Sequence, residues 1–143
     1  MAAQWGSDFF GTLNELPPEP VAGIGHVLEA AASFPTFKEA RQWVLRNLGV
    51  SEGSAILEGG CGNGIALGEL LELVGTCGRI AGIDPTKAFV EAARERAMQL
   101  HAPNARYELG DIRQLPFHDN EFDPALCDKV LIHAGPAAAV SPG

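Results

Sequence analysis

The chain has 143 residues, 46% of them hydrophobic and 20% charged, which suits a single domain with a hydrophobic core of its own. Its formal net charge of −8 at pH 7 argues against a nucleic-acid-binding surface, which needs an excess of lysine and arginine. No apolar run approaches the ~20 residues of a membrane span, and the N-terminus lacks the basic and apolar regions of a secretory signal, so we expect neither a membrane partner nor secretion.

Residues 1–50 are expected to form an N-terminal linker and a helical cap. The proline-rich stretch at residues 15–20 predicts an extended linker. Apolar residues then recur at helical spacing over residues ~20–33, at Val21, Ile24, Val27, Leu28 and Ala31. A second helix is predicted from Pro35 to a C-cap at Gly49, and one face of it carries Phe37, Ala40, Val44 and Leu48.

From residue 51 the pattern changes to short apolar runs that alternate with helices. Strands are predicted over residues 55–57, 79–84, 105–111 and 124–132, and helices over residues 64–75 and 85–100. The second of these helices is expected to bury Val90, Ala93, Ala97 and Leu100. This alternation is typical of a parallel sheet covered on both faces. We therefore expect residues 51–143 to form an α/β, Rossmann-like doubly wound parallel sheet, incomplete at about four strands.

The stretch ILEGGCGNGIAL, residues 56–67, begins like a buried strand and ends like a helix, with Gly60, Gly62 and Gly64 between the two. In a doubly wound sheet, ligands bind at the carboxyl ends of the strands. Glycines at that place let the backbone turn sharply and let a ligand approach closely. The loop therefore predicts a ligand site, with a tight turn that binds nothing as the alternative.

Two classes of ligand compete for this loop. The dinucleotide motif G-x-G-x-x-G needs a third glycine three residues after the second, where this sequence has Ile65 or Leu67. At the end of the strand, Glu58 places a carboxylate that disfavours a pyrophosphate and favours a cation. Spacing and charge therefore favour S-adenosyl-L-methionine, which carries an ammonium and a sulfonium group, over the NAD of an oxidoreductase.

Three motifs follow one another in the order typical of a known family. These are ILEGGCGNG at residues 56–64, GIDPT at residues 82–86 and GDIRQLPFHDNEFD at residues 110–123. Together they resemble the class I S-adenosylmethionine-dependent methyltransferases of the type 11-like group, over about residues 54–134. The resemblance implies methyltransferase activity with S-adenosyl-L-methionine as the cofactor.

The resemblance also implies a set of cofactor-binding residues. In it, Glu58 orients the methionine amino group, Asp84 accepts hydrogen bonds from the ribose hydroxyls, and Asp111 accepts one from the adenine amino group. The backbone and side chain of Ile112 would meet the adenine ring. The complete implied set is Glu58, Gly60, Gly62, Gly64, Asp84, Thr86, Asp111, Ile112, Cys127 and Asp128.

Simpler roles remain open for three of these residues. The carboxylate of Asp84 suits an N-cap of the helix that follows, and Asp111 suits a turn. A small, buried apolar residue is an alternative role for Cys127. The sequence also departs from the family at Gly59, where a bulky apolar residue is usual and the strand end should loosen, and at Pro124, which cannot donate a backbone hydrogen bond to the sheet.

No catalytic residue is assigned, because methyl transfer from a sulfonium needs a general base only when the acceptor must lose a proton. Asp128 and His133 are weak candidates for such a base. No metal site is expected. The three cysteines form no CxxC pair, which favours free thiols and a cytoplasmic location.

Members of this family usually have seven strands, so the resemblance implies a core truncated after the fourth. The fourth strand would then form an exposed apolar edge through which the chain could self-associate. The sequence predicts a methyltransferase that acts on a small-molecule acceptor. The alternative is a fragment that binds the cofactor or a partner protein without turnover.

Overall fold

The computed structural model describes residues 12–127, in which helices and strands alternate after two N-terminal helices. The predicted residues Asp128 and His133 therefore lie outside the described part of the chain. The elements are η1 (Leu13–Glu15), α2 (Pro18–Ala32), α3 (Pro35–Asn47), β1 (Ala55–Gly59), α4 (Leu67–Val74), β2 (Arg79–Asp84), α5 (Lys87–Gln99), β3 (Ala105–Leu109) and β4 (Ala125–Leu126).

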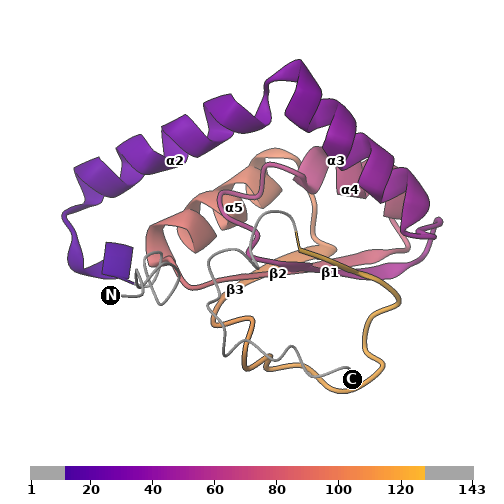
Figure 1. The fold of residues 1–143 in the computed structure, drawn as a ribbon. Helices are drawn as coiled ribbons and strands as arrows, with labels where there is room; N and C mark the ends of the chain where they lie inside the picture. The colour runs from indigo at the N-terminus through magenta and orange to yellow at the C-terminus, as the bar shows by residue number, and fades with distance from the viewer. Residues whose placement is uncertain (1–11, 128–143) are drawn as a thin grey trace, which may run out of the picture.

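The strands form one parallel sheet in the order β3-β2-β1-β4, which confirms the predicted α/β fold. In Figure 1 the helices α2 to α5 lie on one side of the sheet, and the segment from residue 110 to residue 124 runs along the other side. On that second side, the rings of Phe117 and Phe122 meet edge to face at 5.1 Å, and the Arg106 guanidinium lies 5.5 Å from the centre of the Phe117 ring.

The core lies between β1, β2 and the helices α4 and α5. Every residue of β1 is buried, as expected for a central parallel strand. The main core cluster includes Ile56, Ile80, Leu67, Leu70, Val74, Val90, Ala93 and Ala97. On α5, Phe89 is also buried, whereas Leu100, which we expected to be buried, is 47% exposed because it lies just after the last helical residue.

The prediction of an extended linker at residues 15–20 holds only for Leu16 and Pro17, which have extended backbone angles, and is wrong for the rest. Helix α2 begins at Pro18, and η1 ends at Glu15 just before it. A proline in the first helical turn costs no hydrogen bond, and its fixed φ suits a helix. The same rule correctly placed the start of α3 at Pro35, and Gly49 follows that helix with a φ of +70°.

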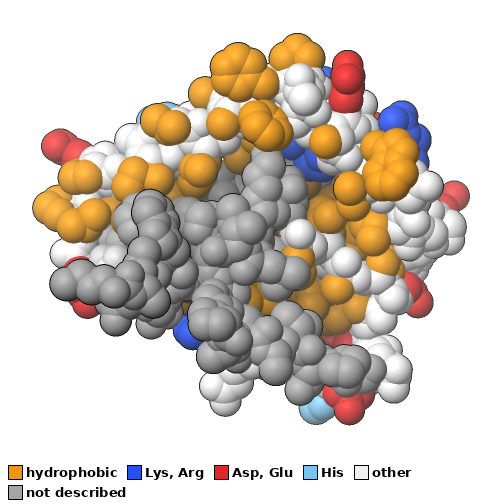
Figure 2. All heavy atoms as spheres, viewed as in Figure 1, with side chains coloured by type: hydrophobic (Ala, Val, Ile, Leu, Met, Phe, Trp, Pro, Cys, Tyr) orange, Lys and Arg blue, Asp and Glu red, His pale blue; other side chains and the backbone are white. Residues whose placement is uncertain are grey.

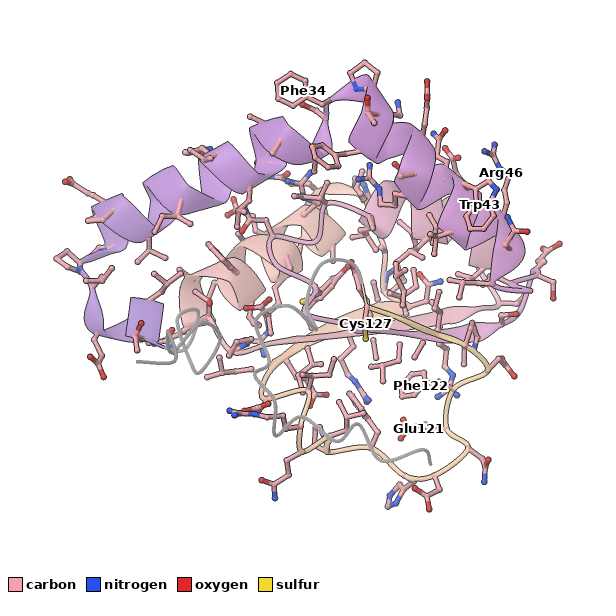
Figure 3. All side chains as sticks on the ribbon, in the orientation of Figure 1. Phe34, Trp43, Arg46, Glu121, Phe122 and Cys127 are labelled. Carbon is pink, nitrogen blue, oxygen red and sulfur yellow. The ribbon has the colours of Figure 1, made fainter. Side chains whose placement is uncertain are left out.

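Helix α3 buries a different face from the one that its apolar residues predict. Phe37 is 43% exposed and Val44 is 37% exposed, whereas Arg41 and Leu45 are buried. Figure 2 shows hydrophobic side chains gathered on the surface of α2 and α3, and in Figure 3 Trp43 projects from α3 beside Arg46. An ion pair explains this orientation better than the apolar pattern does.

That ion pair joins Arg41 of α3 to Glu69 in the first turn of α4. The Arg41 Nη2 atom lies 2.8 Å from Glu69 Oε1, and Arg41 Nε lies 3.2 Å from Oε2. The guanidinium also donates to the carbonyl oxygen of Ala32 at 3.4 Å, so a single side chain holds α3 against the end of α2 and the start of α4. A buried guanidinium is stable only with such partners, which is why α3 turns Arg41 inward.

We expect Glu69→Gln to lower the free energy of unfolding by about 1.5–3 kcal/mol, because it leaves a buried guanidinium without its charged partner. Urea denaturation followed by circular dichroism measures the change. The matched control is Glu91→Gln, which removes an exposed ion pair with Lys87 at 3.8 Å and should cost less than about 0.5 kcal/mol. Equal effects of the two substitutions would contradict this role for Arg41.

A second prediction concerns Gly82 in β2. A Cβ atom built there would lie 2.4 Å from Tyr107 Cδ1 and 2.9 Å from Cys61 Cβ, so Gly82→Ala should destabilise the protein by about 1–3 kcal/mol. Thermal unfolding measures this. The control is Gly68→Ala in α4, where a Cβ meets nothing within 4 Å and the gain in helix propensity should make the change neutral or stabilising. A neutral Gly82→Ala would contradict the packing described here.

Candidate functional site

The carboxyl ends of the strands bring the three sequence motifs to one edge of the sheet. Pairing of β1 with β2 places Glu58 beside Gly82 and Gly59 beside Ile83. Beyond β3, the Gly110 amide donates to the Asp84 carbonyl oxygen at 3.0 Å, which brings the start of the third motif next to the second. The predicted site residues within the described chain therefore come from adjoining segments.

The loop after β1 depends on glycine at alternate positions. Gly60, Gly62 and Gly64 have φ values of +68°, +52° and +73°, in the left-handed region that other residues rarely adopt. The amides of Gly60 and Cys61 both donate to the Ile83 carbonyl oxygen, at 2.8 and 3.0 Å, so the loop folds back over the end of β2. A Cβ at Gly62 would meet nothing within 4 Å, which leaves open space over the loop at that residue.

Asp84 ends β2 with its side chain 6% exposed. Its Oδ2 atom accepts from the Gly62 amide at 2.9 Å, and Oδ1 accepts from the Thr86 amide at 2.9 Å. Burial raises the pKa of Asp84, and the hydrogen bonds from Thr86 and Gly62 act against that rise. The carboxylate therefore joins the glycine loop to the start of α5.

The N-cap position of α5 is occupied by Thr86, not by Asp84, so the alternative role of Asp84 as an N-cap is wrong. Thr86 is fully buried, and both its amide and its hydroxyl bond to Asp84. Thr86 therefore holds the carboxylate in place, and its role in cofactor binding stays a prediction.

Asn14 is a residue of the site that the sequence did not reveal. Its Nδ2 atom donates to the Pro85 carbonyl oxygen at 2.8 Å, and its Oδ1 atom accepts from the Lys87 amide at 2.7 Å. One side chain thus fixes the backbone on both sides of Thr86. An asparagine that precedes its partners by more than seventy residues gives no local sequence signal of this contact.

Glu58 is 6% exposed within β1 and lies on the row of residues that continues to Gly82 and Tyr107. Burial raises the pKa of the Cys61 thiol, and the charges of Glu58 and Asp84 raise it further. Negative charge is therefore concentrated beneath the glycine loop. By Coulomb's law such a place favours a cation over a pyrophosphate, and the choice of ligand stays a prediction.

Asp111 lies on the segment after β3 and is bound by Arg113. The Arg113 amide donates to Asp111 Oδ1 at 2.8 Å, and the guanidinium bonds to both carboxylate oxygens. These bonds hold the pKa of Asp111 below its ordinary value, with the Arg113 side chain as the main cause. The turn formed by Asp111 and Arg113 agrees with the alternative role suggested for this residue, and it keeps the carboxylate ionised.

Gly59, Ile112 and Cys127 meet on the side of the sheet away from the helices. A Cβ at Gly59 would lie 2.7 Å from Ile112 Cδ1 and 2.9 Å from Cys127 Sγ, so these side chains fill the space that a bulky residue would take. Cys127 is exposed, so its alternative role as a small, buried apolar residue is wrong. Partial burial of its thiol still raises the pKa of Cys127, which Figure 3 shows at the sheet above Phe122. The expected loosening of the strand end is therefore wrong, because β1 continues through Gly59.

Pro124 precedes β4 instead of lying within it. Its carbonyl oxygen accepts from the Leu57 amide at 3.1 Å, which needs no donor from the proline. Asp123 closes the same edge, since its amide donates to the Ala55 carbonyl oxygen at 2.8 Å and its Oδ2 atom accepts from the Ala55 amide at 2.8 Å. Of the predicted fourth strand, residues 128–132 lie outside the described chain.

Within residues 12–127, no group of three or more histidine, cysteine, aspartate or glutamate side chains is arranged to hold a metal ion. In the same range, no helix has both the length and the apolar character needed to cross a membrane. The arrangement offers two buried carboxylates, Glu58 and Asp84, near the glycine loop, and a more exposed one, Asp111, on the segment after β3. Carboxylates accept hydrogen bonds and attract cations, so they suit a ligand with cationic and hydrogen-bond-donating groups.

Comparison with known proteins gives the family. Residues 50–141, well over half of the chain, match the family model described as a methyltransferase domain. An uncharacterised 37.1 kDa protein of transposon Tn4556 from Streptomyces fradiae is 38% identical over 80% of this chain and 33% of its own length. Demethylmenaquinone methyltransferase from Staphylococcus aureus is 34% identical over 64% of this chain and 37% of its own length.

Solved structures show the same fold. A SAM-dependent methyltransferase from Aquifex aeolicus superposes with a TM-score of 0.61 at 24% identity, over 78% of this chain and 56% of that protein. The chain spans about a third of the length of the curated relatives. The matched family model, the order of the motifs and the sheet order agree, and the chain therefore belongs to the class I S-adenosylmethionine-dependent methyltransferase family.

Proposed function

We propose that the protein binds S-adenosyl-L-methionine at the edge formed by β1, β2 and the segment after β3, and transfers its methyl group to a small-molecule acceptor. The observation that carries the proposal is the carboxylate of Asp84. It is buried at the end of β2 and fixed by the Gly62 amide and Thr86, next to open space at Gly62. Burying an ionised acid there is costly, and a ligand diol whose hydroxyls donate hydrogen bonds to the carboxylate explains its presence.

Each part of the cofactor has a matching residue. Glu58 would receive the ammonium group, Asp84 the ribose hydroxyls, and Asp111 the adenine amino group, with Ile112 beside the ring. Cys127, Gly60 and Gly64 would shape the surrounding walls, and Asp128, which lies outside the described residues, stays in the proposed cofactor-binding set. When bound, the cofactor supplies an electrophilic methyl group on a sulfonium. The protein residues contribute binding, alignment and exclusion of water.

The acceptor is proposed to be a small molecule, in keeping with the relative named demethylmenaquinone methyltransferase.

Neither a nucleic acid nor a membrane is proposed as a partner, because the net charge of −8 disfavours the first and the sequence lacks a span for the second. A cytoplasmic location is proposed because Cys61, Cys77 and Cys127 are all free thiols. Self-association through the edge of β4 also remains a proposal.

A second candidate function is binding without turnover. Any general base, for which Asp128 and His133 are the candidates, would act only on an acceptor that must lose a proton.

Two measurements test the proposal. Calorimetry with S-adenosyl-L-homocysteine measures binding, and radiolabelled S-adenosyl-L-methionine with quinone and phenol acceptors measures transfer. Binding with transfer supports the enzyme, and binding without transfer supports the second candidate. Absence of binding, or tighter binding of NADH, would overturn both.

We expect Asp84→Ala to weaken binding of S-adenosyl-L-homocysteine by at least ~1 kcal/mol, or about fivefold, because it removes a buried charged hydrogen-bond acceptor. Calorimetry at neutral pH measures this. The matched control is Asp119→Ala, an exposed carboxylate on the segment after β3, which should leave the affinity unchanged. Unchanged affinity in Asp84→Ala would remove Asp84 from the site.

A further inference from the structure

Tyr107 on β3 is the only tyrosine of the chain, and its side chain is buried beneath the glycine loop. The residue is 2% exposed, and its hydroxyl has no hydrogen-bond partner among the described residues. Such a buried hydroxyl is unfavourable for the fold, and natural proteins rarely keep one. A phenylalanine would fill the same space without this cost, so the hydroxyl calls for another explanation.

The ring of Tyr107 reaches from β3 across β2 towards β1. Tyr107 pairs with Gly82, and Gly82 pairs with Glu58, so the three residues form one row across the sheet. A Cβ at Gly82 would lie 2.4 Å from Tyr107 Cδ1 and 2.5 Å from Cε1, which means that the ring occupies the side-chain position of the glycine. The ring tip lies next to the glycine loop, since a Cβ built at Gly64 would be 3.5 Å from Tyr107 Cζ.

The charges around the hydroxyl favour its role as a donor. Burial raises the pKa of Tyr107, the charge of Glu58 raises it further, and Arg96 acts in the opposite direction. The phenol therefore keeps its proton. Glu58 and Cys61 are the two groups whose charges raise the pKa of Tyr107. The Glu58 carboxylate is a much stronger hydrogen-bond acceptor than the Cys61 thiol.

The backbone and neighbours of Tyr107 hold it in this place. Arg94 Nε donates to the Tyr107 carbonyl oxygen at 2.8 Å. Arg96 Nε donates to the Asn63 carbonyl oxygen at 3.2 Å, and its Nη2 atom pairs with Glu29 of α2. Two arginines of α5 thus tie the strand, the glycine loop and α2 together around the phenol.

We propose that Tyr107 is a positioning residue for Glu58: in the ligand-bound protein its hydroxyl donates a hydrogen bond to the Glu58 carboxylate and holds this carboxylate towards the ammonium group of the cofactor. The inference rests on the proposed function, because it concerns the same site. A donor behind the carboxylate stabilises the ionised form in a buried place and fixes the direction of its remaining lone pairs. Gly82 is then required as the residue over which the phenol reaches Glu58.

The experiment compares two ligands that share the adenosine group. S-adenosyl-L-homocysteine carries the amino-acid part, and 5′-methylthioadenosine lacks it. We expect Tyr107→Phe to weaken binding of S-adenosyl-L-homocysteine by about five- to tenfold and to leave binding of 5′-methylthioadenosine within about twofold of wild type. An equal loss for both ligands, or no loss for either, would overturn the proposal.

A double-mutant cycle tests the route through Glu58. In a Glu58→Gln background, Tyr107→Phe should have little further effect on S-adenosyl-L-homocysteine. A full effect in that background would mean that Tyr107 acts on something else, which overturns the proposal. Val90→Ala, in the same core cluster, is the control for loosened packing, and it should lower the melting temperature without changing the ratio of the two affinities.

The outcome for the wild-type protein separates the two proposals. If the wild-type protein binds S-adenosyl-L-homocysteine and Tyr107→Phe does not weaken this binding, only the role of Tyr107 is overturned. Absence of binding to either ligand overturns the proposed function, and the role of Tyr107 with it.

Discussion

The carboxylate of Asp84 is the interaction on which the site depends. It bonds to the Gly62 amide on one side and to Thr86 on the other, so it sets the distance between the glycine loop and the start of α5. The loop, in turn, rests on the Ile83 carbonyl oxygen through two amides. An ionised group in such a buried position is unfavourable for folding by itself, since burial raises its pKa. The surrounding amides lower that cost and leave the site ordered before a ligand arrives.

The N-terminal helices support this arrangement from outside the motifs. Asn14 holds the turn at Pro85 and Lys87, and Arg96 joins the glycine loop to α2. Helix α2 also lies close over the loop, because a Cβ at Gly25 would be 3.0 Å from Asn63 Nδ2. The site is therefore built from the motif-bearing sheet and from a layer whose sequence carries no motif. Mutations in that layer can reach the site without touching a ligand.

Sequence reasoning worked best where backbone chemistry is local. A proline and a glycine marked the start and the end of α3, the apolar run at residues 79–84 matched β2, and Gly60, Gly62 and Gly64 marked a sharp turn, where their φ values are positive. The predictions from sequence failed where a residue's orientation or role depends on a partner far along the chain. The buried face of α3 follows from the pairing of Arg41 with Glu69 and not from Phe37 or Val44. Asn14 and Tyr107 acquire their roles from contacts with residues far along the chain, and Gly59 is filled by Ile112 and Cys127. No pattern within one element contains that information.

The order of the sheet has a consequence for synthesis of the protein. β1 is a central strand, yet its two neighbours are made at very different times: β2 begins at Arg79, whereas Leu57 pairs with Ala125. A chain emerges from the ribosome N-terminus first, so β1, β2 and β3 can pair before residues 123 and 124 are made. Until then, the Ala55 and Leu57 amides lack their acceptors, which are the Asp123 carboxylate and the Pro124 carbonyl oxygen. During that interval an apolar strand exposes a full row of backbone donors and acceptors. The nascent chain is therefore most open to mispairing before residue 123 appears, and the Asp123 carboxylate and the Pro124 carbonyl oxygen are the first groups that pair with this edge of β1.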